Sequence, residues 1–321
     1  MKRRTVLGGL LISLMICSSL FQGTLQGRLV KAGPGTETDS GNSESENNGE
    51  MVREYYPGGE LKSETPYAAG TIHGTVVTYY ENGNPMKREE YRAGVRNGAY
   101  REFYEDGTLK KHETYREDRQ IGECFTNYPN GTRMMEGSCE DGKKAGRWTL
   151  FHQNGNKYME GEYLDDERQG AWRIYSPEGW LDSEGEYLKG EQSGLWTYYD
   201  RARRVVMKLT LKGGQVAGSA WLYSQGKLVG EGSMTGQVRE PIKHGPWKAF
   251  YMNGRIEHEG VYTMGKKNGP FREYYENGAL MAHGEYSNDE RSGEWVFYLK
   301  DGKSMDPERT GSYVAGKLEV R

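Results

Sequence analysis

The chain has 321 residues, a formal net charge of −3 and a mean hydropathy of −0.90. Its 24 Tyr, 7 Trp and 46 Gly argue against a disordered chain, which is usually poor in aromatic residues. They suit short strands and tight turns around a thin hydrophobic layer better than a large closed core. Charges of both signs are interspersed, so the clustered basic face that binds nucleic acid is missing from the sequence.

Residues 1–32 have the pattern of an export signal. Positive charges at residues 2–4 precede an apolar run over residues 5–20, which is too short for a typical membrane span. The stretch Leu14-Met15-Ile16-Cys17-Ser18 resembles a bacterial lipobox, in which Cys17 would be acylated, although Ile16 stands where that motif has a small residue. Val30-Lys31-Ala32 instead suits an ordinary signal peptidase. We expect an exported protein of the cell envelope, in the periplasm or at the surface, that contacts the membrane only through its N-terminus.

Residues 33–50 differ in composition from everything that follows. They contain five acidic residues and no Lys, Arg or aliphatic side chain. Such a segment buries too little apolar surface to offset its conformational entropy. The sequence therefore predicts a flexible acidic tether here.

Residues 51–318 contain a repeat with a period of 24 residues. Glycines recur at that spacing at Gly74, Gly98, Gly122, Gly146, Gly170, Gly194 and Gly218, and again at Gly245, Gly269 and Gly293. A large aromatic residue stands two positions after most of them, at Tyr100, Trp148, Trp172, Trp196, Trp247, Phe271 and Trp295. A second aromatic stands five positions after them. We expect the first aromatic column to form the core of the repeats.

Two turn signals divide each repeat into a hairpin. Asn-Gly or Asp-Gly fills one column, whose glycines are Gly83, Gly107, Gly131, Gly155, Gly254, Gly278 and Gly302. Because these pairs tolerate positive φ, they are strong hairpin signals between β-patterned segments. The second strand runs through Glu-Gly to a Tyr, and a further turn closes the unit. The sequence predicts an all-β, elongated, single-layer antiparallel meander of about eleven hairpin repeats.

This pattern resembles the MORN repeat family, in particular its bacterial, antitoxin-like variant with Trp-x-x-Tyr-Tyr and Asn-Gly in each unit. The resemblance implies a twisted row of hairpins over residues 51–318. Three departures predict an irregular region near residues 200–244, where the array would bend or break. Arg201-Ala202 stands where Asn-Gly is expected, one residue is missing before Gly226, and residues 237–244 form an insertion.

The sequence contains no recognisable catalytic, cofactor or metal motif. Its six histidines do not share a repeat column and are expected to be surface residues. A column of glutamates, including Glu136, Glu160, Glu184 and Glu259, recurs once per repeat, which favours a structural role. No phosphate-binding loop or Gly-x-Ser-x-Gly elbow is present. We expect a non-enzymatic protein without cofactor or metal.

Two cysteines remain beyond the signal, both in repeat three. Cys124 takes the Trp position and Cys139 the later Tyr position, symmetrically about the expected turn. They should therefore face each other across the hairpin at a distance that a disulfide can span. Two free buried thiols are the alternative.

The leading functional hypothesis is an exported scaffold that binds a protein partner through a Tyr-rich sheet face. An antitoxin or immunity protein that masks a toxin is a second hypothesis, and an attachment module for polysaccharide or lipid surfaces is a third. The sequence names no ligand.

Overall fold

The computed structural model describes residues 49–319. The predicted signal, Cys17 and nearly all of the predicted tether lie outside this part of the chain. Residues 49–319 form strands and turns and no helix. The strands are β1 (Glu50–Tyr55), β2 (Leu61–Ala68), β3 (Thr71–Ile72), β4 (Gly74–Tyr79), β5 (Pro85–Arg92), β6 (Val95–Phe103), β7 (Leu109–Arg116), β8 (Arg119–Asn127), β9 (Arg133–Glu140), β10 (Lys143–Phe151), β11 (Lys157–Leu164), β12 (Glu167–Tyr175), β13 (Leu181–Leu188), β14 (Glu191–Tyr199), β15 (Val205–Lys212), β16 (Gln215–Ser224), β17 (Lys227–Gln237), β18 (Glu240–Phe250), β19 (Ile256–Thr263), β20 (Lys266–Tyr274), β21 (Leu280–Ser287), β22 (Glu290–Phe297), β23 (Gly311–Val314) and β24 (Lys317–Leu318).

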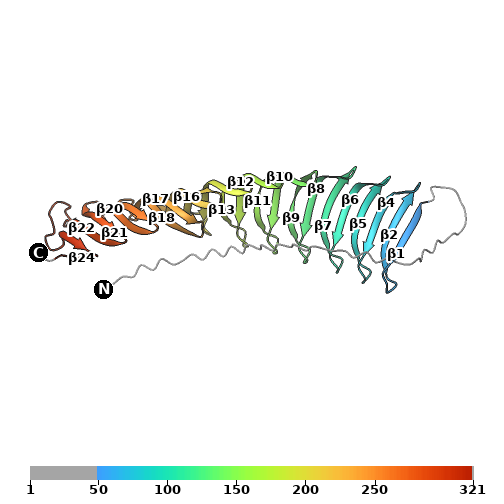
Figure 1. Ribbon diagram of the computed structural model, residues 1–321, viewed down its shortest axis with the longest axis horizontal. Coiled ribbons are helices and arrows are strands. Elements are labelled where there is room, and N and C mark those ends of the chain that lie inside the picture. The colour runs from blue at the N-terminus through green and yellow to red at the C-terminus, as the bar shows by residue number, and fades with distance from the viewer. Residues whose placement is uncertain (1–48, 320–321) are drawn as a thin grey trace. The chain divides into compact units, whose positions relative to one another are not determined.

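Consecutive strands pair antiparallel along this whole row, with β3 and β4 both paired to β2. Figure 1 shows the hairpins side by side in chain order, from blue at β1 to red at β24. The predicted all-β meander of hairpins, elongated and one layer thick, is confirmed.

The Asn-Gly turns have one geometry, which the turn at residues 128–132 illustrates. The Gly131 N–H donates to the Tyr128 carbonyl (2.9 Å), and the Tyr128 N–H donates to the Thr132 carbonyl (2.8 Å). Gly131 has a φ of 81°, whereas Asn130 is absent from the residues of positive φ. Only the glycine of this pair therefore adopts the left-handed region.

Asparagine serves these turns through its side chain. The Asn130 Oδ1 accepts the Thr132 N–H (3.1 Å), and its Nδ2 donates to the Gln153 carbonyl in the next repeat's turn (3.1 Å). The same contact to a carbonyl 23 residues onward is made by Asn82, Asn154, Asn253 and Asn277. Each Asn thus joins two neighbouring hairpins.

At the other end of the hairpins, two-residue turns connect the strands. Lys189 and Gly190 illustrate them, with φ of 51° and 80°. Two successive positive φ values define a type I′ turn, whose twist matches that of paired strands. These turns alternate with the Asn-Gly turns and give each repeat its two ends.

The recurring first glycine of each repeat marks an irregularity in the pairing between repeats. Glu160 pairs with Arg173, but Glu162 pairs with Gln169. Gly161 therefore lies opposite the residues from Gly170 to Trp172 instead of opposite a single residue. Gly170 has a φ of 67°, a region that side chains disfavour. The extra residues form a bulge that redirects the strand.

The irregular region near residues 200–244 contains no break in the sheet. Ala202-Arg203, not Arg201-Ala202, occupies the turn, where Arg203 takes the glycine's conformation (φ 58°). A two-residue turn at Gln225 and Gly226 accommodates the missing residue. The insertion lengthens β17 and β18 to 11 residues each. Strands β14 to β18 remain paired in order, so the expected break is absent.

Candidate functional site

The tryptophan and Phe271 rings of the aromatic column lie flat on a glycine of the preceding strand. A Cβ added to Gly161 would lie 2.3 Å from the Trp172 ring, well inside van der Waals contact. The Trp172 Nε1–H donates to the Glu162 carbonyl beside it (3.2 Å). Tyr100 of this column is only half-buried, whereas six other rings are at most 3% exposed: Trp148, Trp172, Trp196, Trp247, Phe271 and Trp295. The Glu-Gly step therefore needs its glycine because a ring occupies the space of a side chain.

Tyrosines of the second strand connect these rings into a ladder. Tyr163 meets Trp172 edge to face with ring centroids 5.2 Å apart, and Tyr187 meets Trp172 at 5.7 Å. The series continues at Tyr187–Trp196, Tyr262–Phe271, Phe271–Tyr286 and Tyr286–Trp295. We call this side of the sheet the ladder face and the opposite side the pocket face.

A column of cationic side chains covers the ladder. Lys243 lies 4.6 Å from the Trp247 ring centre and 4.8 Å from that of Tyr262. Burial, together with the neighbouring Lys267, lowers the pKa of Lys243. Equivalent contacts are made by Lys144, Arg168, Lys267 and Arg291. Because rings and cations stabilise one another here, the ladder face is occupied by its own contacts.

The pocket face carries a different set of tyrosines, which hydrogen-bond the glutamate column. The Tyr175 hydroxyl donates to Glu160 (2.6 Å), Tyr199 to Glu184 (2.6 Å) and Tyr274 to Glu259 (2.9 Å). The Tyr175 hydroxyl, then Lys157 and Arg147, lower the pKa of Glu160 to about 2. The carboxylate column thus has structural partners across its strands.

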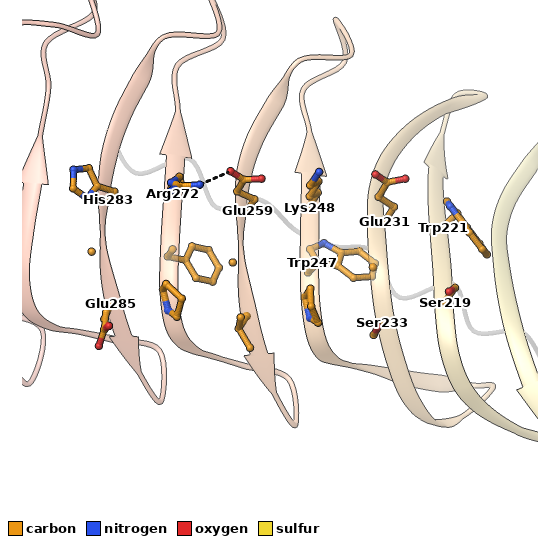
Figure 2. A pocket seen from close by; sticks show the side chains of 17 residues that line it. Ser219, Trp221, Glu231, Ser233, Trp247, Lys248, Glu259, Arg272, His283 and Glu285 are labelled. Carbon is orange, nitrogen blue, oxygen red and sulfur yellow. Dashed lines mark hydrogen bonds and ion pairs between the residues drawn. The ribbon is translucent and has the colours of Figure 1, made fainter.

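A hollow of about 820 Å³ lies on the pocket face between β16 and β21. Its lining combines flat apolar groups, Trp221, Pro246 and Pro270, with charged groups. Figure 2 shows Trp221, Glu231, Lys248, Glu259, Arg272 and His283 in one row across neighbouring strands. Arg272 and Glu259 form an ion pair (3.5 Å). Glu231 and Lys248 are paired in register, yet neither forms an ion pair with any described residue. The hollow therefore offers an aromatic ring and unpaired charges of both signs.

A smaller hollow of about 420 Å³ lies on the same face over β10 to β14. It surrounds Arg173, which is ion-paired with Glu184 (3.3 Å), and Leu195, which is 48% exposed. This hollow lies toward the N-terminus of the array from the Trp221 hollow.

The structure joins Cys124 and Cys139 by a disulfide, with Cα atoms 6.0 Å apart. They are not directly opposite, because Cys124 pairs with Gly137 and Cys139 with Gly122. The paired strands are centred on Asn130 and Gly131, not on Gly131 and Thr132, so the residue opposite Cys124 lies two positions before Cys139. The bond therefore runs diagonally, at the positions where the next repeat places Trp148 against Tyr163.

Sequence reasoning missed a column of turn residues. Tyr80, Tyr104, Tyr251 and Tyr275 each donate their hydroxyl to a carbonyl 23 residues onward. His152 takes this place in its repeat, against the Tyr175 carbonyl (3.0 Å). The second Tyr of the repeated Tyr-Tyr pairs could have indicated this column in the sequence.

Trp221 was also missed. It stands three residues after its repeat glycine, Gly218, whereas Trp172 stands two residues after Gly170. In a strand, that offset of one places the ring on the opposite face. The spacing of Trp221 from its repeat glycine could therefore have predicted this position from the sequence.

Two histidines depart from the expected surface positions. His258 is half-buried against Phe271 (ring centroids 5.7 Å apart), and burial lowers its pKa to about 4. His112 is stacked on Phe125 (4.9 Å). Within residues 49–319 no group of three or more His, Cys, Asp or Glu could hold a metal ion. This part of the chain also has no helix long and apolar enough to cross a membrane.

The family model described as the MORN repeat variant matches at residues 51–69, 72–93, 96–117, 168–189 and 267–288. Each match covers strands of the hairpin row, such as β12 and β13 at residues 168–189. The chain thus contains MORN repeats of this variant at these five places. The bacterial, antitoxin-like subtype stays a prediction.

Comparison with curated proteins found no match. Among solved structures, the chain is similar to the Photorhabdus luminescens Tc holotoxin pore, at 12% identity and a TM-score of 0.20, over 79% of this chain and 18% of that chain. A second match is the TcdB2-TccC3-Cdc42 structure, at 10% identity and a TM-score of 0.18, over 84% of this chain and 17% of that chain. The chain thus spans less than a fifth of each of these proteins, and such low scores carry no functional meaning.

Proposed function

We propose that this chain is an exported, non-enzymatic repeat scaffold whose pocket face binds a protein partner, with the Trp221 hollow as the main contact. The ladder face is filled by its own rings and cations, so the accessible chemistry lies on the pocket face. This binding surface differs from the Tyr-rich face expected from the sequence, because no tyrosine lines either hollow.

The position of Trp221 is the observation that carries the proposal. The ladder tryptophans are buried on glycines, whereas Trp221 lies half-buried in a hollow. No described residue accepts a hydrogen bond from its indole N–H. Tryptophans in such hollows are frequent centres of binding energy in protein interfaces. A peptide segment could pack on the ring and on Pro246 and Pro270 while its polar groups meet Glu231 and Lys248.

Two further observations support export and the absence of catalysis. A structural disulfide forms and persists in an oxidising compartment, which fits the signal-type N-terminus. The non-enzymatic role is part of the proposal, and the pocket serines, Ser219 and Ser233, have no hydrogen-bonded base among the described residues.

The test is capture of partners from the envelope fraction of the native organism by Trp221→Ala and by a matched control, Trp180→Ala. Trp180 is a half-buried turn residue that contacts Arg201 (4.6 Å) and lines neither hollow. The proposal predicts that a discrete protein is retained by the wild type and the control and lost by Trp221→Ala. Equal capture by all three would reject the hollow as the contact site.

A further inference from the structure

The N-terminal repeats reverse the charge of the glutamate column on the pocket face. The residues at the glutamate positions are Glu64, Arg88, His112, Glu136, Glu160 and Glu184 in successive repeats. Arg88 pairs in register with Arg101, and Arg101 pairs with His112, so two arginines and a histidine occupy neighbouring strands β5, β6 and β7. In the later repeats the same row alternates in sign, as Glu160, Arg173 and Glu184.

The aromatic partner of this column changes together with the charge. Tyr79, Tyr175 and Tyr199 donate hydroxyls to glutamates 15 residues before them. The residue 15 positions after Arg88 is Phe103, which has no hydroxyl, and Arg88 lies 5.8 Å from its ring centre. His112 is likewise stacked on Phe125, which Arg133 covers from 3.5 Å. Burial, together with the neighbouring Arg101, lowers the pKa of His112, so the two arginines supply the positive charge of this row and the phenylalanine rings form its aromatic floor.

The positive charges of this row are incompletely neutralised. Arg88 forms no ion pair with any described residue, and Arg101 reaches only Glu90, at 3.8 Å between half-exposed side chains. One Glu90 oxygen already accepts the Ala99 N–H (3.1 Å). Arg133 forms an ion pair with Glu136 (3.1 Å). Glu123 lies on the neighbouring strand β8. Like charges directly opposed across strands are destabilising, so the pairing of Arg88 with Arg101 lowers the stability of the sheet.

We propose that Arg88, Arg101 and His112 form a second binding site, separate from the Trp221 hollow, for an acidic segment of a partner protein. A guanidinium group presents a planar fork that fits a carboxylate. The rings of Phe103 and Phe125 supply the apolar contact that a peptide, unlike a free anion, can use. Strands β6 and β16 are ten steps apart, or roughly 50 Å at the usual strand spacing. One partner, or two, could therefore contact both sites without overlap.

The experiment measures fluorescence anisotropy of a labelled peptide of alternating Glu and Ser with the purified full-length protein. The variant Arg88→Glu introduces the glutamate that most other repeats carry at this position, so its melting temperature should equal or exceed that of the wild type. Its affinity for the peptide should fall about tenfold, as expected for loss of a charge-assisted contact. The matched control is Arg92→Glu, an exposed arginine on the same strand, which makes the same change in net charge.

Comparable weakening by Arg88→Glu and Arg92→Glu would overturn the site, because the peptide would then sense only net charge. Binding of an equivalent Gln and Ser peptide would overturn it as well. So would Arg88-dependent binding of phosphatidylserine vesicles or of inorganic phosphate with affinity equal to that of the peptide. The Trp221→Ala variant must retain the peptide, since the site does not depend on the Trp221 hollow.

Discussion

Each buried ring of the ladder has a small residue facing it across the strands, and the sequence varies the two together. Gly161 faces Trp172, Gly185 faces Trp196, and Gly284 faces Trp295. At one repeat the sizes are exchanged, since Leu209 pairs with Ala220 and both are 0% exposed. The combined volume of the two facing side chains thus stays similar from repeat to repeat, as close packing requires.

A double-mutant cycle on Gly161 and Trp172 tests this size matching. Gly161→Ala should cost about 2–3 kcal/mol of unfolding free energy, because its Cβ would overlap the ring. Trp172→Ala should cost about 3–5 kcal/mol. In the Trp172→Ala background the alanine at 161 should cost almost nothing, giving a coupling energy of about 2–3 kcal/mol in denaturant unfolding. Additive costs would show that Gly161 is needed for its backbone alone.

The Glu160–Tyr175 contact predicts a pH dependence of stability. The Tyr175 hydroxyl is the first cause that lowers the pKa of Glu160 from 4.5 to about 2, and burial and Glu160 raise the pKa of Tyr175 to about 12. A lowered carboxyl pKa contributes stability that is complete above the unfolded pKa and is lost as the pH falls through the folded pKa. Tyr175→Phe should therefore cost about 1–2 kcal/mol at neutral pH.

That difference should shrink between about pH 5 and pH 2, where Glu160 takes up its proton. Urea unfolding across this range measures it. Tyr223→Phe is the matched control, because Tyr223 stands in the same repeat column without a hydrogen-bonded glutamate among the described residues. A pH-independent cost for Tyr175→Phe would mean that the hydroxyl does not act through the carboxylate.

At the scale of the hairpin, the sequence predicted the elements and only part of what joins them. Glycine spacing and Asn-Gly columns located the strands because backbone conformation is a local property. The side-chain contacts from Asn130 and Tyr104 to the following repeat were not predictable from turn propensity, because they depend on how closely neighbouring turns pack. The diagonal of the disulfide was missed because the hairpin is centred on Asn130 and Gly131, which places Gly137 and not Cys139 opposite Cys124.

The disulfide predicts a local weak point under reducing conditions. A loop closed across 15 positions contributes roughly 3 kcal/mol in the chain-entropy account. Repeats contact only their neighbours, so the loss should stay near them. Hydrogen exchange after reduction should show lost protection in β8 and β9 and unchanged protection in β20 and β21. Uniform loss over the array, or no change in β8 and β9, would contradict a local staple.

At the scale of the whole array, the repeat makes the two faces unequal. The ladder face repeats the same ring-on-glycine packing in most units. The pocket face varies from unit to unit, with Arg88 and His112 on β5 and β7 and Trp221 on β16. The period predicted the first face because identical columns stack on one another. The candidate sites consist of residues that differ from the repeat pattern, so the repeat pattern could not predict them.

The most direct test of partner binding at the Trp221 hollow is site-specific photo-cross-linking in cells of the native organism. A benzoylphenylalanine probe is placed at Ser219 or Ser233 in the hollow, or at the exposed turn residue Met252 as a control. We expect one cross-linked protein from both pocket positions, none from Met252, and loss of the product in the Trp221→Ala background. The same product from Met252, or yields from the pocket positions that Trp221→Ala leaves unchanged, would contradict a partner site in this hollow.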